Sequence, residues 1–205
     1  MEKKRQVVYL HGLSSSGQST TAQRLRRTLS KQEVISPDIP VQPEVAVTEL
    51  RRLASMLRPD AIIVGTSMGG MFAQLFRGFQ RILINPSFHT SRHLKEKVGQ
   101  RLPFHNPRKD GLTDFEVSDK LVKKFEKLEA QQFDKKFGII GKNPDDPSQV
   151  CAFFGTRDTV VNCKDEYLEH YGNAVDFDGE HRLDPNSTIT LIVPKILELC
   201  GENPD

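Results

Sequence analysis

The sequence predicts an α/β protein with three layers: a mostly parallel sheet of about six strands, with helices on both faces. The first observation is a set of short, nearly continuous apolar runs bounded by turn residues, which is typical of strands buried on both faces. The second is that segments with helical spacing separate these runs, as in strand–helix repeats. The third is length, because 205 residues suit a single domain, expected over residues 1–205.

The predicted strands follow the apolar runs in chain order. They are QVVYL at 6–10, VISPD at 34–38, AIIVG at 61–65, RILINP at 81–86, VCAFFG at 150–155 and NAVDF at 173–177. The predicted helices lie between or after them, at 20–29, 43–57, 68–79, 112–133, 165–171 and 189–199. In the first helix, Ala22, Leu25 and Leu29 form one apolar stripe. The 68–79 segment is small and apolar, so we expect that helix to be buried.

One region, about 88–148, interrupts the strand–helix rhythm and contains no convincing strand. Prolines and glycine mark a loop between 103 and 111, and Leu112 to Phe133 reads as an amphipathic helix with lysines on its polar side. Two interpretations remain open. The helix either lies on the surface with its apolar stripe against the core, or belongs to a helical insert that caps a site at the sheet edge.

The composition excludes several classes of function. Lys and Arg number 29 against 27 Asp and Glu, so no global charge indicates nucleic-acid binding. No apolar stretch approaches the ~18 residues of a membrane span. The three cysteines, Cys151, Cys163 and Cys200, are widely spaced, which argues against a disulfide framework and a zinc site. The N-terminal apolar run is too short for a signal peptide, and we expect a cytoplasmic protein without a metal.

Residues 65–69, Gly-Thr-Ser-Met-Gly, end one predicted strand and begin the next helix. Gly-x-Ser-x-Gly in this position is the pattern of a nucleophile elbow, in which a strained turn projects the serine hydroxyl from the top of a sheet. Glycines flank the serine because the strand and helix backbones come too close for side chains. Ser67 is therefore the predicted nucleophile, although a serine here could also be a simple helix N-cap.

A serine nucleophile needs a base and a group that orients the base. Asp158 follows the strand at 150–155, and His181 follows the strand at 173–177, which gives the chain order Ser, Asp, His. Since sites in open α/β sheets form beyond the carboxyl ends of the strands, we expect these three side chains to meet. The alternatives are that Asp158 only caps a helix and that His181 is an exposed loop residue.

The stretch HGLSSSGQST at 11–20 nearly matches a phosphate-binding loop, but Gln18 occupies the position that requires lysine. We interpret the stretch as the second half of an oxyanion hole, in which Leu13 and Met68 supply backbone N–H donors. Gly12 would let the backbone approach the reacting group. A nucleotide site built from Gly12–Ser19 remains an alternative.

Several separated motifs resemble the small YqiA-like esterases of the α/β-hydrolase superfamily. They are YLHGLSSSGQST, SPDIP at 36–40, GTSMGG at 65–70, LINPS at 83–87, FFGTRDTVVN at 153–162 and GEHRL at 179–183. The resemblance implies a reduced α/β-hydrolase sheet that lacks the usual leading antiparallel hairpin. It also implies Ser67, Asp158 and His181 as a triad that hydrolyses carboxylic esters or thioesters.

The function predicted from the sequence is a serine hydrolase that acts through an acyl-enzyme on Ser67, with His181 as base and Asp158 as orienting acid. It needs no cofactor. His11, Gly12 and Ser14 are predicted to contact the substrate, a small acyl ester or thioester. The alternative is a ligand-binding protein that has the same scaffold without turnover.

Overall fold

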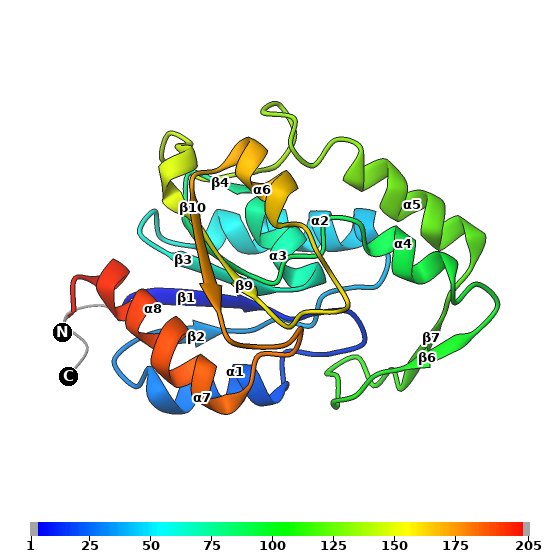
Figure 1. Ribbon diagram of the computed structural model, residues 1–205, viewed down its shortest axis with the longest axis horizontal. Helices are drawn as coiled ribbons and strands as arrows, with labels where there is room; N and C mark the ends of the chain where they lie inside the picture. Colours follow the sequence, from blue (N-terminus) through cyan, green and yellow to red (C-terminus); the bar gives the residue numbers. More distant parts are fainter. Residues whose placement is uncertain (1–3, 203–205) are drawn as a thin grey trace.

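The computed structural model describes residues 4–202, which form a central sheet between two layers of helices (Figure 1). The six-stranded sheet has the order β10-β9-β5-β3-β1-β2, and every pairing in it is parallel. These strands are β1 (Gln6–Leu10), β2 (Glu33–Ile35), β3 (Ile62–Thr66), β5 (Gln80–Ile84), β9 (Val150–Gly155) and β10 (Asn173–Phe177). The predicted parallel sheet of about six strands is confirmed.

The apolar runs form strands because both faces of the sheet are covered. Alternate residues of β3 enter two separate cores: Ile63 joins one, and Ile62 and Val64 join the other. All of these side chains are fully buried. Continuous hydrophobicity is therefore what a central strand of this sheet requires, and a polar residue on either face would be buried without water.

The helices divide between the two faces (Figure 1). On one side lie α1 (Thr20–Thr28), α7 (Pro185–Ser187) and α8 (Val193–Cys200), the last two joined by a π-helical turn at Thr188–Ile192. On the other lie α2 (Pro43–Met56), α3 (Met68–Gln74), α5 (Asp119–Glu129) and α6 (Lys164–His170). Helices on both faces were predicted and are confirmed.

The region 88–148 contains strands as well as helices. After α4 (Thr90–Lys95), the strands β6 (Arg101–Pro103) and β7 (Asp114–Glu116) form an antiparallel hairpin. Further along, β8 (Ile139–Ile140) pairs with β4 (Phe76–Arg77). The expectation that this region has no strand was wrong. So was the helix predicted from Leu112, because β7 occupies 114–116 and α5 begins at Asp119.

The errors have a common physical cause. Strands of two or three residues show no measurable alternation, so the sequence pattern cannot reveal them. Likewise the helix predicted over 68–79 ends at Gln74, because the chain turns into β4 there. The apolar stripe of α5 is as predicted: Leu121, Val122, Phe125 and Leu128 are buried.

The region 88–148 is attached to the rest of the fold by a buried polar network. The guanidinium of Arg81, a residue of β5 with no exposed surface, donates to Asp145 at 2.6 Å. Arg77 of β4 also pairs with Asp145, and it donates to the carbonyl of Gln132 beyond α5. These bonds fix the segment that follows α5, from Gln132 to Asp145, against β4 and β5. Within residues 4–202, no helix has the length and apolar character needed to cross a membrane.

Candidate active site

Ser67 lies at a sharp turn between β3 and α3. Its backbone has φ 56° and ψ −123°, a conformation that is rare for a residue with a side chain. The turn is possible only with glycines on both sides. A Cβ on Gly65 would lie 2.1 Å from the carbonyl oxygen of Gly69, and a Cβ on Gly69 would lie 2.1 Å from that of Leu10. The geometry is that of a nucleophile elbow, with the strain held by the packing of α3 against β1 and β3.

A chain of hydrogen bonds joins Ser67, His181 and Asp158. The Ser67 hydroxyl lies 3.0 Å from His181 Nε2, and His181 Nδ1 lies 2.8 Å from Asp158 Oδ2. Since Asp158 accepts at Nδ1, the neutral imidazole carries its proton there and leaves Nε2 free to accept from the serine. The structure thus brings together three residues that the sequence placed at separate strand ends.

Asp158 is fixed by its own loop. Its side chain is 4 % exposed, and the Oδ1 atom accepts hydrogen bonds from the backbone N–H groups of Val160 and Val161. One oxygen therefore organises the turn after β9 while the other orients the imidazole. Asp158 does not cap the helix that follows, because α6 begins at Lys164 and its N-cap residue is Cys163. His181 is 18 % exposed, which leaves its ring accessible from one side.

The loop after β1 lies directly against the serine. A Cβ on Gly12 would be 3.3 Å from Ser67 Cβ and 3.8 Å from its Oγ. The next residue, Leu13, is half-buried against the core, and Ser14 has a positive φ of 59°. Met68 is the first residue of α3, so its N–H has no carbonyl partner within the helix. Gly12 and Met68 thus both lie next to Ser67, and the oxyanion hole formed by Leu13 and Met68 stays a prediction.

His11 faces away from solvent and holds this loop from behind. It is 1 % exposed, its Nε2 accepts from the N–H of Ile39, and its Nδ1 lies 2.8 Å from the carbonyl oxygen of Gly12. Both ring nitrogens are thus engaged by backbone groups, which leaves none for a substrate. Burial lowers the pKa of His11 to about 4, so the ring is neutral near pH 7.

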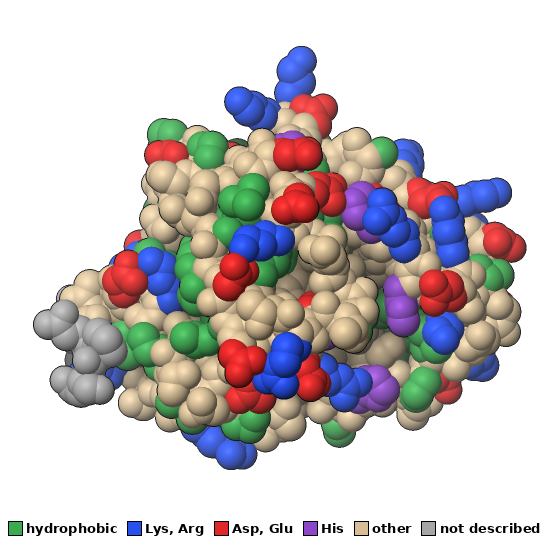
Figure 2. Space-filling model, in the orientation of Figure 1, with side chains coloured by type: hydrophobic (Ala, Val, Ile, Leu, Met, Phe, Trp, Pro, Cys, Tyr) green, Lys and Arg blue, Asp and Glu red, His purple; other side chains and the backbone are tan. Residues whose placement is uncertain are grey.

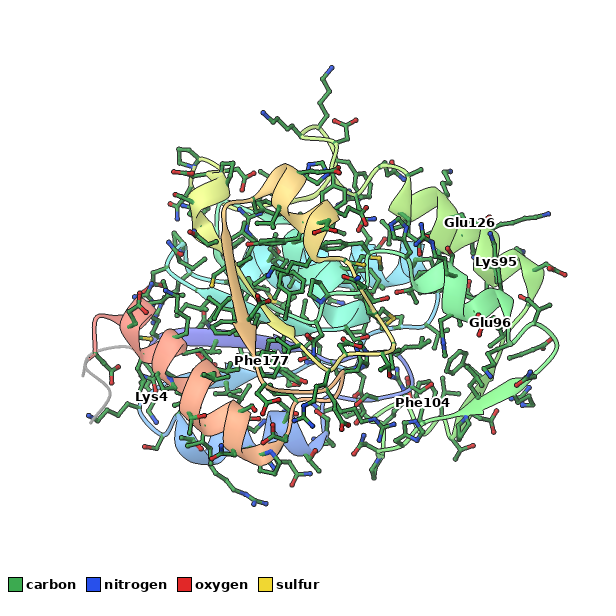
Figure 3. The ribbon with its side chains drawn as sticks, in the orientation of Figure 1. Lys4, Lys95, Glu96, Phe104, Glu126 and Phe177 are labelled. Carbon is green, nitrogen blue, oxygen red and sulfur yellow. The ribbon has the colours of Figure 1, made fainter. Side chains whose placement is uncertain are left out.

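The β6–β7 hairpin docks onto the other side of the same loop. The N–H of His105 donates to the carbonyl of Ser14, and Arg108 donates to the carbonyls of Ser15 and Ile39. The Arg108 side chain is only 2 % exposed, and its guanidinium lies 4.3 Å from the centre of the Phe104 ring. Figure 3 labels Phe104 at the end of the hairpin that adjoins the 11–19 loop. The 11–19 loop is therefore fixed from outside by a hairpin that the sequence did not reveal.

In the stretch at 11–20, which resembles a phosphate-binding loop, backbone N–H groups donate to side chains of the protein itself. The N–H of Gly17 donates to Asp38 Oδ1 at 2.7 Å, and that of Gln18 donates to the Ser16 hydroxyl. Ser19 caps α1 by accepting from the N–H of Ala22. A carboxylate of the protein thus already occupies the position at Gly17 where a phosphate would bind.

The sequence motifs did not single out Asn85, which follows β5 and lies at the same edge of the sheet as Ser67. In the described part of the chain, the non-glycine residues with positive φ are Ser14, Ser67 and Asn85, and all lie at this edge of the sheet. Backbone strain of this kind gathers at functional sites. The available signal was an asparagine at a strand end, a residue type that tolerates positive φ.

The face that carries these residues is hollowed between the loop after β9 and the β6–β7 hairpin (Figure 2). Residues 4–202 contain no cluster of three or more His, Cys, Asp or Glu side chains that could hold a metal ion. Of the other histidines, His89 pairs with Glu166 at 2.7 Å.

Fold and site geometry together define an α/β-hydrolase fold. The chain aligns with a monoacylglycerol lipase from Paleococcus ferrophilus over 97 % of its own length and 96 % of the lipase, with a TM-score of 0.64 and 15 % identity. Est1E from Butyrivibrio proteoclasticus aligns over 98 % and 90 %, with a TM-score of 0.61 and 16 % identity. Alpha/beta hydrolase domain-containing protein 10 from mouse aligns over 98 % and 92 %, with a TM-score of 0.62 and 16 % identity.

The family is given by a match in sequence. The model of the uncharacterised protein family UPF0227 covers residues 6–189, and the chain belongs to that family. This confirms the resemblance to the YqiA-like group. No curated protein sequence matches the chain significantly.

Proposed function

We propose that this protein is a serine hydrolase that cleaves carboxylic esters or thioesters through an acyl-enzyme on Ser67. The observation that carries the proposal is the unbroken hydrogen-bond chain Ser67–His181–Asp158, with distances of 3.0 Å and 2.8 Å. A serine hydroxyl is a weak nucleophile unless a base accepts its proton as it attacks. His181 Nε2 is the base, and Asp158 orients the ring and stabilises the imidazolium that forms.

The reaction has two balanced halves. Ser67 Oγ attacks the acyl carbon, and its proton passes to His181 Nε2. The bond from the acyl carbon to the leaving oxygen or sulfur then breaks, and His181 returns the proton to the leaving group. Water next attacks the acyl-enzyme, His181 accepts a proton from it, and the acid leaves as Ser67 regains its proton.

The negative charge on the carbonyl oxygen needs donors that are already in place. We assign this role to the backbone N–H groups of Leu13 and Met68, on the close approach of Gly12 to Ser67 and the position of Met68 at the start of α3. Removing one such donor typically lowers turnover by about 10²–10³. Gly12 and Ser14 line this part of the site. We assign His11 to positioning the loop, because both of its ring nitrogens contact backbone groups.

The region 88–148 covers one side of the site within a single domain. Its hairpin contacts the 14–15 loop, and its helices are joined to each other by the Lys95–Glu126 ion pair, which Figure 3 labels. A nucleotide-binding function is not favoured, because the Gly17 N–H already donates to Asp38 and because Gln18 stands where a phosphate-binding loop has lysine. The ester function agrees with the name of the monoacylglycerol lipase that shares the fold.

The test is a panel of p-nitrophenyl esters and acyl-CoA thioesters of several chain lengths, assayed with the wild type and with Ser67→Ala. The wild type should hydrolyse at least one of them and react with a fluorophosphonate probe. Ser67→Ala should lose labelling completely and lose turnover by as much as about 10⁶-fold. The panel also separates ester from thioester preference.

The matched control is Ser55→Ala, which removes an exposed hydroxyl on α2 that bonds only to the carbonyl of Arg52. It should label and turn over like the wild type. A folded wild type that neither labels nor hydrolyses any substrate would refute the proposal and would favour the ligand-binding alternative.

A further inference from the structure

Asn85, at the end of β5, bonds to the end of β9 and to the loop after β10. It follows β5, which lies between β3 and β9 in the sheet, and the residue is 2 % exposed. Its amide Nδ2 donates to the carbonyl oxygens of Glu180 at 2.9 Å and His181 at 3.1 Å. Its Oδ1 accepts from the N–H of Gly155 at 2.7 Å. One side chain thereby bonds to the backbone of the base and to the end of the strand that precedes the orienting acid.

The chemistry of these bonds requires asparagine. The carbonyl oxygens of Glu180 and His181 need two donors, and the N–H of Gly155 needs an acceptor. A primary amide offers two N–H donors and one oxygen acceptor on a single planar group. Aspartate would keep the acceptor for Gly155 but would turn a second oxygen toward the carbonyls of Glu180 and His181. The main chain of Asn85 also donates, to the carbonyl of Phe153 in β9. Its positive φ of 43° aims the amide across the sheet edge.

The loop that carries His181 has few other ties to the sheet. The N–H of Arg157 donates to the carbonyl of Gly179, and a Cβ on Gly155 would lie 2.6 Å from that same oxygen. The exposed ion pair of Arg157 with Asp178 contributes little. Asn85 therefore supplies the buried contact made directly to the backbone of the base.

We infer that Asn85 is a positioning residue, which fixes the position and ring orientation of His181 relative to Ser67 and Asp158. The inference rests on the proposed function for its kinetic consequence, but the geometry of His181 can be measured without turnover. A displacement of about 1 Å in a catalytic group lowers the rate by about 10²-fold. Substrate binding should change little, because Asn85 is buried behind His181.

The experiment compares Asn85→Asp and Asn85→Gly with the wild type, in the full chain. Glycine adopts the positive φ of this position without strain, so it removes the amide and leaves the backbone conformation accessible. The matched control is Asn173→Asp, at the opposite end of the sheet, where the Asn173 amide also faces two backbone carbonyls, those of Ser148 and Val150. Circular dichroism and thermal unfolding establish that each variant is folded.

Two readouts then follow. In proton NMR, the wild type should show the hydrogen-bonded Nδ1 proton of His181, and both Asn85 variants should lose or shift that signal. In kinetics, kcat and the fluorophosphonate rate constant should fall by about 10²-fold with KM little changed. Asn173→Asp should retain both properties.

The outcomes separate the two proposals. A wild type that shows the Nδ1 signal but never labels refutes the hydrolase, while the loss of that signal in the variants still supports the positioning role. Folded Asn85 variants that keep the Nδ1 signal and the wild-type kcat overturn the inference. Failure of both variants to fold also overturns it, because Asn85 would then serve the stability of the fold and not the geometry of His181.

Discussion

Substitution of Gly69 by alanine tests whether close backbone contact builds the site. Gly69 lies in the first turn of α3, immediately beside β1. An added Cβ would lie 2.1 Å from the carbonyl oxygen of Leu10, 2.5 Å from its carbon and 2.6 Å from the carbonyl oxygen of His11. All of these atoms belong to backbone, so no side chain can rotate away. The helix itself must move.

The size of the movement follows from the contacts. An ordinary contact begins near 3.4 Å, so α3 must move from β1 by about 1.3 Å, the difference between 3.4 and 2.1 Å. Overpacking of this kind destabilises a fold by about 1–3 kcal/mol. The better helix propensity of alanine offsets at most about 1 kcal/mol of this. Because Ser67 precedes α3 and Leu10 precedes the 11–17 loop, the nucleophile and the oxyanion loop separate, and turnover should fall by about 10²-fold or more.

The assay measures kcat/KM on the best ester of the panel, together with the free energy of unfolding in urea. The control is Gly172→Ala, because a Cβ on Gly172 meets no heavy atom within 4 Å. That variant should match the wild type within about 0.5 kcal/mol and in activity. Wild-type stability and turnover in Gly69→Ala would refute the contact reasoning.

Two further predictions concern the loop beside Ser67. Burial lowers the pKa of His11 from 6.5 to about 4. Between these two pH values the unfolded chain binds a proton at His11 that the folded chain does not bind. The free energy of unfolding therefore decreases as the pH falls through this range. Urea unfolding between pH 7 and pH 4 should show the wild type losing up to about 3 kcal/mol more than His11→Gln, and equal pH slopes would contradict this. Arg108→Met removes the donors to Ser15 and Ile39, so hydrogen exchange in residues 101–116 should accelerate. Arg101→Gln, which breaks only the exposed pair with Asp114, should leave exchange unchanged, and equal exchange in both variants would contradict the docking role.

Much of the sheet could be predicted because its central strands are buried on both faces. That burial imposes continuous apolar runs such as AIIVG, and it leaves glycines and polar residues to mark the strand ends. The prediction failed where elements are too short to show a period. The β6–β7 hairpin is stable through its partners, Ser14 and Ser15 among them, and those partners lie about 90 residues away in sequence.

The sequence by itself determined the local chemistry of the site: a serine between glycines at a strand end, an acid after β9 and a histidine after β10. It could do so because the carboxyl ends of parallel strands share one edge. Only the tertiary structure decided that Ser67 and His181, 114 positions apart, lie 3.0 Å from each other. It also decided that Asn85 holds the backbone of His181 and that His11 faces the core. These facts depend on which backbone groups meet across the sheet edge, and no local pattern records the partners of a backbone carbonyl.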